Sequence, residues 1–577
     1  MTPDAVQTPP QLDNQYETDR VLRSYVRRVL PDEIYAAVEP GLRAMGERAG
    51  KELYALQQDD VGAEPSLTRW GAWGDRIDQI ELTEVWQRAE EIAAEHGVVA
   101  TAYEQTHGRH SRVHQMALAY LFIPSTDMYG CPLAMTDGAA RTLLDHGRQT
   151  LVEKAVPHLT ARDPQAFWTS GQWMTEITGG SDVSNTRTSA RRDDEGTWRL
   201  YGRKWFTSAI TANMALALAR PAENPDGSDG LGLFYVPIRD EDGPADGIYV
   251  NRLKNKLGSR KLPTAELTLD GAIAYPVADE PRHGTRHIAP MLTVTRTWNA
   301  VTAASYLRRG LALARDYARR REAFGDAIIN HPLHQETLAD LQAQLEGMVH
   351  LSFRLAELLG GREMEEADAN DRALLRLLTP IAKLTTAKQA VAGTSEVLEA
   401  FGGAGYVEDT GLPPLLRDAQ VLPIWEGTTN VLALDLLRGV KATGGLDPLG
   451  TEFERCLTAV EEPQLRQAAR EALDAFQSAA EWLRAAQTEG PDALQAGARR
   501  FALTLGRALE LAYTARHAQW TLTHEQDGRS AAAAERLAAQ PIDRITERAA
   551  DSTDALAREA QGPVLSEKFE TSPADAA

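Results

Sequence analysis

The chain has 577 residues, 43% of them hydrophobic and 25% charged, with 82 acidic against 61 basic residues and a formal charge of −21. This composition excludes a disordered or fibrous chain and indicates a globular protein of several domains. The negative charge disfavours binding to nucleic acid or to an anionic membrane, and no run of about 18 apolar residues is present to span a bilayer.

The N-terminal sequence MTPDAVQTPPQLDNQYETD has neither a basic n-region nor an apolar h-region, so we expect an unprocessed lead-in and a cytoplasmic protein. Apolar residues then return every three to four positions, which predicts an N-terminal helical domain over 1–167. Within it PSTDMYGCPLAMTDGAA (124–140) breaks the period and predicts a packed loop. Cys131 and Cys456 have no CxxC or histidine spacing, so we expect neither a disulfide framework nor a metal site.

Short segments rich in aromatic and β-branched residues follow, separated by DDEG, NPDGSDG and EDGPADG. They predict a central β domain over 168–288, a small barrel or sandwich. Long helical patterns return over 289–442, as in a helical bundle, and a further helical extension is expected over 443–577. The fold class is therefore α+β, mainly α. Because strands and helices do not alternate, the order of the segments argues against a doubly wound sheet.

Several motifs have both a structural and a functional interpretation. The glycines of FGGAGYV (401–407) follow a helix rather than a strand, so a turn between helices is favoured over a dinucleotide fingerprint. MTEITGGSDVSNT (174–186) is either a Gly/Ser turn or a site for a polar ring edge or pyrophosphate. Trp205 and Thr207 of RKWFTS lie on one side of a strand, as core residues or as a wall for a flat heterocycle. RRREAFG (319–325) is either a charged helix end or a diphosphate clamp.

In their order and spacing these motifs resemble the acyl-CoA dehydrogenase superfamily of flavoproteins. The matching elements run from about 170 to 440 and are MTEITGGSD, RKWFTS, KLGSRKLPTAEL (256–267), RREAFG, FGGAGYVEDTGLPPLLRDA and IWEGTTN. Within the superfamily the chain is similar to the alkylation-response AidB subgroup, on MTEITGGSDVSNT, on the His331–Pro332 junction and on LPxxxRD followed by IWEG.

The resemblance implies that Glu426 of IWEGTTN is the catalytic base of an acyl-CoA dehydrogenase. It would remove the α proton of an acyl-CoA while flavin N5 takes hydride from the β carbon, giving a trans-2-enoyl-CoA. The thioester oxygen would accept hydrogen bonds from the Glu426 amide and from the flavin ribityl chain. The structural alternative is a glutamate that caps the following helix.

The resemblance also implies an FAD site. Thr207 matches a position near flavin N5, Thr175 one near the pyrimidine edge, and Arg321 and Phe324 match residues that hold the FAD of a neighbouring subunit. A homodimer or homotetramer is therefore expected. The full set of positions that match FAD contacts is Met174, Thr175, Gly180, Ser181, Trp205, Thr207, Arg321, Phe324, Gly402, Gly403, Thr428 and Asn430.

Three positions depart from the family pattern: Pro332, Glu399 and Asn430 stand where the family often has glutamine. We therefore expect the dinucleotide end of FAD to be held differently. Subgroup members with DNA affinity are thought to use a basic C-terminal region, but residues 441–577 carry 15 basic and 22 acidic residues here. Nucleic acid is not an expected partner, and the extension is expected to pack on the bundle or on a neighbouring subunit.

Three functions remain open at this point. The first is a dehydrogenase that passes electrons to an electron-transfer flavoprotein, and the second is an acyl-CoA oxidase that passes them to oxygen. The third is an AidB-like flavoprotein with little turnover that binds fatty acyl groups or protects DNA. A nitroalkane oxidase is disfavoured, because that branch carries aspartate where Glu426 stands.

Overall fold

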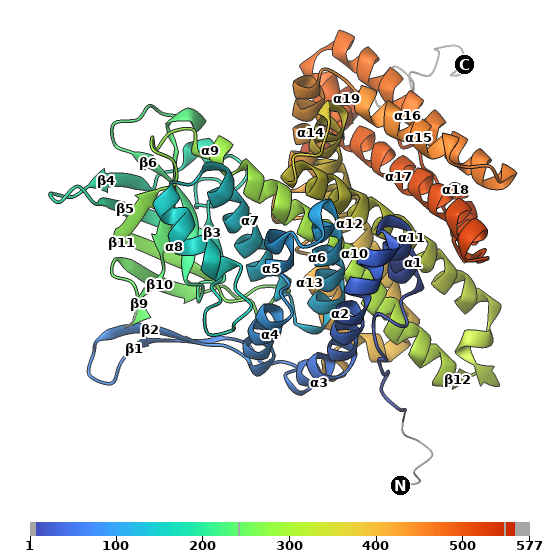
Figure 1. Cartoon of the computed structure of the whole chain (residues 1–577), viewed down its shortest axis with the longest axis horizontal. Helices are drawn as coiled ribbons and strands as arrows, with labels where there is room; N and C mark the ends of the chain where they lie inside the picture. Colours follow the sequence, from blue (N-terminus) through green and yellow to red (C-terminus); the bar gives the residue numbers. More distant parts are fainter. Residues whose placement is uncertain (1–6, 241–242, 547–549, 560–577) are drawn as a thin grey trace, which may run out of the picture.

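The computed structural model describes residues 7–240, 243–546 and 550–559. It arranges them as N-terminal helices, a small β-barrel and a large C-terminal helical part (Figure 1). The α+β, mainly α, fold class expected from the sequence is confirmed. In the described part of the chain, no helix is long and apolar enough to cross a membrane.

Among the described residues, eight α-helices precede the barrel. They are α1 (Arg20–Val29), α2 (Asp32–Gly50), α3 (Glu52–Asp59), α4 (Glu84–Glu95), α5 (Ala100–Glu104), α6 (Ser111–Phe122), α7 (Gly130–His146) and α8 (Gln149–Leu159). The prediction of a packed loop over 124–140 is wrong, because most of this segment belongs to α7. This helix is buried on nearly every side and so lacks an amphipathic period. Gly138 allows its close approach to α10, since a Cβ there would lie 2.6 Å from Met291 Cγ.

A hairpin interrupts these helices, where the sequence predicted helix. Its strands are β1 (Ser66–Trp70) and β2 (Arg76–Glu81), and it extends beside the barrel (Figure 1). Two polar contacts join it to barrel strand β10: Arg76 donates to the carbonyl of Val250 at 2.8 Å, and Asp78 accepts from the amide of Val250 at 2.8 Å. Tertiary contacts therefore support a two-stranded element that would be marginal alone.

The barrel contains seven strands, β3 (Ser170–Trp173), β4 (Ser189–Arg192), β5 (Trp198–Ser208), β6 (Met214–Pro221), β7 (Gly232–Pro237), β10 (Ile248–Leu253) and β11 (Thr264–Pro276). They follow the order β10-β11-β5-β4-β6-β3, and β7 pairs with both β6 and β11, so the sheet closes. The register places Thr207 opposite Ala265 on the antiparallel pair β5–β11. Besides the β1–β2 hairpin, two further short pairs of the described chain lie outside it, β8 (Arg239–Asp240) with β9 (Gly243–Pro244) and β12 (Glu322–Ala323) with β13 (Asp326–Ala327).

The C-terminal part is helical: α9 (Gly284–His287), α10 (Ala289–Arg320), α11 (Pro332–Glu363), α12 (Ala369–Ala400), α13 (Pro413–Ala419), α14 (Thr429–Thr443), α15 (Asp447–Thr458), α16 (Pro463–Glu489), α17 (Pro491–His524), α18 (Arg529–Ala538) and α19 (Ala550–Arg558). Helix α17 of the extension packs on α11, α12 and α14, as the sequence led us to expect. Glycines permit this contact: a Cβ on Gly506 would lie 2.0 Å from Thr385 Oγ1.

Candidate functional site

Glu426 lies in the loop between α13 and α14, on a backbone that residues with a Cβ avoid. Its φ is 55°, and that of Gly427 is 102°. The left-handed region costs an L-residue about 1–2 kcal/mol. Glycine adopts this conformation freely, whereas Glu426 is held there by its surroundings.

Basic side chains from two bundle helices hold three successive carbonyls of this loop. Lys383 of α12 donates to the carbonyl oxygens of Trp425 at 2.6 Å and Gly427 at 2.8 Å. Arg296 of α10 donates to the carbonyl oxygen of Glu426 at 3.2 Å. These contacts fix the loop that presents the glutamate, and the sequence motifs signalled neither base.

The Glu426 side chain is positioned by one hydroxyl. Thr295 of α10 is buried, and its Oγ1 lies 2.8 Å from Glu426 Oε2. Within the described residues, Oε1 accepts no hydrogen bond and the backbone N–H of Glu426 donates none. One carboxylate oxygen and one amide hydrogen are therefore available to a ligand at the same residue.

The interpretation of Glu426 as a helix cap is wrong. Thr428 is the N-cap of α14, and its hydroxyl accepts from the amide of Val431 at 3.4 Å. Asn430, on the exposed first turn, accepts from Arg499 of the extension at 3.4 Å. Glu426 thus has no part in starting the helix.

Lys383 combines deep burial with this positioning role. Burial lowers the pKa of Lys383 to about 7, even though Glu426 favours its charged form. In the unfolded chain its pKa returns to about 10.4. Between these values the unfolded state binds a proton that the folded state does not, so stability rises with pH over this window.

Lys383→Met is expected to remove the rise in folding stability between about pH 7 and pH 10. From pH 7.5 to 9.5 the wild-type free energy of unfolding should gain about 2–3 kcal/mol that the variant does not gain. Urea unfolding at the two pH values measures the difference, with Lys388→Met on the same helix as the matched control. Equal pH slopes for wild type and Lys383→Met would contradict the assignment.

On the barrel side, the loop after β3 meets β5. The amide of Trp205 donates to the carbonyl of Thr175 at 3.0 Å, and Gly180 lies against the Thr175 side chain. Within the described residues the hydroxyls of Thr175 and Ser181 make no hydrogen bond. The Thr207 hydroxyl instead donates to a β11 carbonyl at 2.7 Å and is fully buried. Met174 is partly buried against the core.

A buried ion pair that sequence reasoning missed fixes this loop. Lys204 Nζ lies 2.8 Å from Glu176 Oε1, and both side chains are almost fully buried. Glu176 also accepts from the amide of Arg187 at 2.7 Å and from the hydroxyl of Thr188 at 2.5 Å. Burial alone would raise the pKa of Glu176, but Lys204 and these hydrogen bonds hold it below its usual range. Both residues lie inside quoted motifs, each beside a candidate position: Glu176 follows Thr175, and Lys204 precedes Trp205.

Barrel and bundle meet at Cys131 of α7. Burial raises the pKa of its thiol to about 12; the charge of Lys256 lowers it to a smaller extent, and that of Glu426 raises it. Lys256 donates to the hydroxyl of Thr264 at 2.9 Å, and Thr264 lies 3.2 Å from the hydroxyl of Ser208. Lys256, which is linked through Thr264 to the end of RKWFTS, and Glu426 of the loop therefore both act electrostatically on this protonated thiol.

The KLGSRKL loop is docked on α13. A Cβ on Gly258 would lie 2.1 Å from the carbonyl oxygen of Arg417, so the loop requires glycine. The amide of Ser259 donates to Asp418 at 2.6 Å, and burial raises the pKa of Asp418 to about 6. Asp418 of LPxxxRD thus joins the barrel to the helix that precedes Glu426.

Four candidate residues lie far from this junction. Helix α10 has 32 residues; Thr295 is in its second turn, and Arg321 directly follows its end. At about 1.5 Å per residue, roughly 40 Å separates them. Gly402 and Gly403 lie at the same distant end, because the ring of the preceding Phe401 is 5.0 Å from that of Tyr317. Phe324 directly follows β12 and is fully exposed; β12 is labelled in Figure 1.

The chain matches known family models along most of its length. Residues 7–164 match the adaptive response protein AidB N-terminal domain, 171–272 the acyl-CoA dehydrogenase middle domain, and 282–441 the acyl-CoA dehydrogenase C-terminal domain. Acyl-CoA dehydrogenase family member 11 of Caenorhabditis elegans is 43% identical over 527 residues, which cover 89% of this chain and 85% of that protein. The putative acyl-CoA dehydrogenase AidB of Escherichia coli is 32% identical, over 70% and 76%.

Solved structures of related proteins have the same fold as this chain. The structure of C. elegans ACDH-11 in complex with C11-CoA has a TM-score of 0.91 at 40% identity and covers 95% of this chain and 94% of that one. An acyl-CoA dehydrogenase from Bacillus anthracis complexed with FAD shares the fold, with a TM-score of 0.72 at 17% identity over 92% and 90%. The chain belongs to the acyl-CoA dehydrogenase family, with an N-terminal domain of the AidB type.

Proposed function

We propose that this protein is an FAD-dependent dehydrogenase of acyl-CoA thioesters, with Glu426 as the base that takes the α proton. The observation that carries the proposal is the Glu426 loop. It presents a carboxylate held by Thr295 and an unused backbone N–H at one residue, beside the barrel. The similarity to a protein solved in complex with C11-CoA supports this substrate class.

The residues of the junction fit the proposed chemistry. FAD, when bound, supplies the acceptor for the hydride that leaves the β carbon. The N–H of Glu426 would donate to the thioester oxygen and make the α carbon more acidic. Thr295 keeps the carboxylate oriented, and its free oxygen Oε1 would receive the proton.

The barrel side also fits a flavin. The unpaired hydroxyls of Thr175 and Ser181 suit polar ring edges. Lys254 Nζ lies 3.6 Å from the centre of the Trp205 ring, so a flat ligand would use another side of that indole. Because Thr207 already donates to the sheet, its hydroxyl offers lone pairs rather than a proton.

We also propose a homodimer or a dimer of dimers. Arg321, Phe324, Gly402 and Gly403 lie roughly 40 Å from the Glu426 loop, which is further than one dinucleotide reaches. Residues at both ends serve FAD only if the distant group binds the cofactor of a neighbouring subunit. The exposed Phe324 ring and an Arg321 with no ion pair in the described chain suit this role. An electron-transfer flavoprotein is the proposed electron acceptor.

The test is an anaerobic visible spectrum of the purified protein before and after addition of acyl-CoAs of increasing chain length. Prompt bleaching of the flavin band by one length class is expected. Oxygen consumption then separates an oxidase from a dehydrogenase. A yellow protein that no acyl-CoA reduces would refute the dehydrogenase and favour the binding or protective role.

A further inference from the structure

A cavity of about 660 Å³ lies apart from the Glu426 loop, between the N-terminal helices and the extension. Residues of α1, α6, α11 and α17 line it, together with the turn at Gly108–His110. None of the candidate flavin residues is among them. Its volume is that of a small-molecule site.

Three arginines line this cavity, and two of them, Arg28 and Arg516, have no ion pair in the described chain; the Arg28 guanidinium lies over the Tyr25 ring, 4.9 Å from its centre. Within the described residues, neither Arg28 nor Arg516 has a carboxylate within ion-pair distance or a hydrogen-bond acceptor. The buried Nε of Arg28 makes no hydrogen bond. Arg109 has only a loose pair, 3.6 Å from Glu366.

Among the described lining residues one carboxylate, Glu357, attracts Arg28 and Arg516 through space but forms no ion pair with either. The oxygens of Glu357 are taken by the hydroxyl of Tyr25 and by Arg354, which donates at 3.1 Å. Burial lowers the pKa of Arg516, and the charges of Arg455 and Arg28 lower it further, against smaller opposing effects of Cys456 and Glu357. Unpaired, mutually repelling cations around a cavity lower stability in the absence of a ligand, in a protein that otherwise has excess acid.

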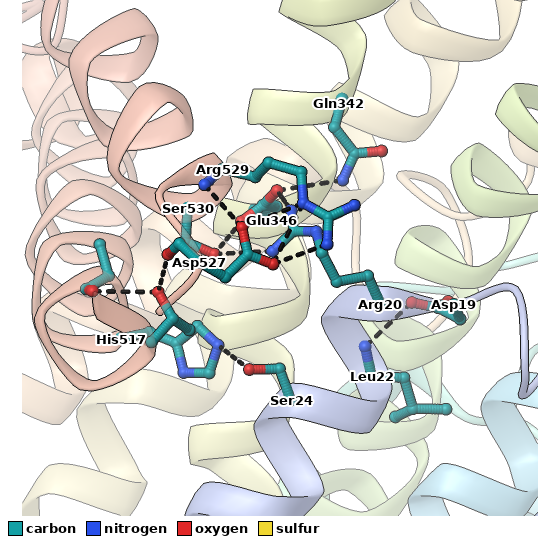
Figure 2. Close-up of polar contacts among 12 residues, drawn as sticks. Asp19, Arg20, Leu22, Ser24, Gln342, Glu346, His517, Asp527, Arg529 and Ser530 are labelled. Carbon is teal, nitrogen blue, oxygen red and sulfur yellow. Dashed lines mark hydrogen bonds and ion pairs between the residues drawn. The ribbon is translucent and has the colours of Figure 1, made fainter. Parts of the chain in front are cut away.

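The walls of the cavity are held together next to it. Figure 2 shows α1 reaching the bundle and the extension through Arg20 and Ser24. Arg20 donates to Ser530 at 2.9 Å, and Ser530 donates to Glu346 at 2.8 Å. Ser24 Oγ lies 3.1 Å from His517 Nε2, one residue after Arg516. The arginines therefore sit on a preformed frame.

We propose that this cavity binds a small phosphorylated molecule, with its phosphate between the guanidiniums of Arg28 and Arg516. Guanidinium groups bind phosphate through paired, charge-assisted hydrogen bonds. The cavity is larger than inorganic phosphate requires, and Val113, Ala459 and Trp520 give an apolar wall for an organic body. Such a ligand joins the N-terminal helices to the extension.

Thermal unfolding of the holoprotein tests the site. Inorganic phosphate and phenyl phosphate, compared with sodium chloride at equal ionic strength, are expected to raise the Tm by a few degrees. Calorimetry should give tighter binding for phenyl phosphate. Arg516→Gln should weaken it at least tenfold, whereas Arg484→Gln, an exposed arginine of the same extension, should not.

A second readout separates a ligand site from a structural role. Without phosphate, Arg516→Gln should be at least as stable as wild type, because it removes repulsion. Its flavin bleaching by acyl-CoA should be unchanged, so the result is independent of the proposed function. The site is refuted if phosphate and phenyl phosphate fail to bind, or bind equally to the Arg28→Gln/Arg516→Gln variant. Strong destabilisation of phosphate-free Arg516→Gln would also count against it.

Discussion

Replacing Glu426 by glutamine is expected to slow the reduction of bound FAD by acyl-CoA about 10³-fold, within the range that one general base contributes. Glutamine has nearly the same shape, and its side-chain oxygen can still accept from Thr295. The backbone contacts of Arg296 and Lys383 do not involve the replaced atoms. The loss should therefore be chemical rather than structural.

Anaerobic stopped-flow spectroscopy measures this effect as the rate of flavin bleaching at saturating acyl-CoA. Flavin content, Tm and acyl-CoA affinity should stay close to wild type, which separates loss of the base from loss of the site. Glu481→Gln, on the exposed face of α16, is the matched control. A variant that keeps a tenth or more of the wild-type rate would show that another group takes the proton.

The sequence motifs located Glu426 but not the means of holding it. A glutamate after an apolar run can be recognised in the sequence. Its φ of 55° and the hydrogen bonds from Lys383 and Arg296 to its loop depend on tertiary structure. Arg296 lies 130 residues before Glu426. Nothing in local spacing marks such a contact, because long helices bring together positions remote in the chain.

The same reason explains the failures in the N-terminal part. Hydrophobic periodicity reveals a helix when one face is apolar and the other polar. Helix α7 is buried on nearly all sides and therefore shows no such periodicity. The β1–β2 hairpin is exposed and carries strand-like alternation around Gly74, which has a φ of 92°. It was overlooked because helical patterns flank it. The barrel, with its clear turn signals, was predicted well.

The length of α10 shows that the candidate FAD residues form two groups that lie far apart in one chain. The sequence led us to expect FAD contacts both around Arg321 and Gly402 and around Thr175, yet the length of α10 separates the two groups. The sequence motifs contain no information about this distance, whereas the structure of a single chain does. If both groups contact FAD as proposed, each cofactor must be bound by residues of two subunits, so the proposed site requires an oligomer.

Lys204→Met is expected to destabilise the protein by about 3–5 kcal/mol at pH 8. The substitution leaves the carboxylate of Glu176 buried without its cation. Because Glu176 anchors the loop that carries Thr175 and Ser181 through the amides of Arg187 and Thr188, FAD should also be lost more readily. Urea unfolding and the flavin content of the purified variant measure the two effects.

The pH dependence identifies the cause. In the wild type the pKa of Glu176 lies below its usual range, so its stabilising contribution is present at neutral pH and is lost as the pH falls below about 4. Without Lys204, burial raises that pKa instead, and protonation of Glu176 should shrink the stability deficit between pH 8 and pH 5. Glu176→Gln added to Lys204→Met should recover much of the loss at pH 8, since no buried charge remains. A deficit that is independent of pH and unrelieved in the double variant would mean that lost packing, rather than an unpaired carboxylate, destabilises the loop.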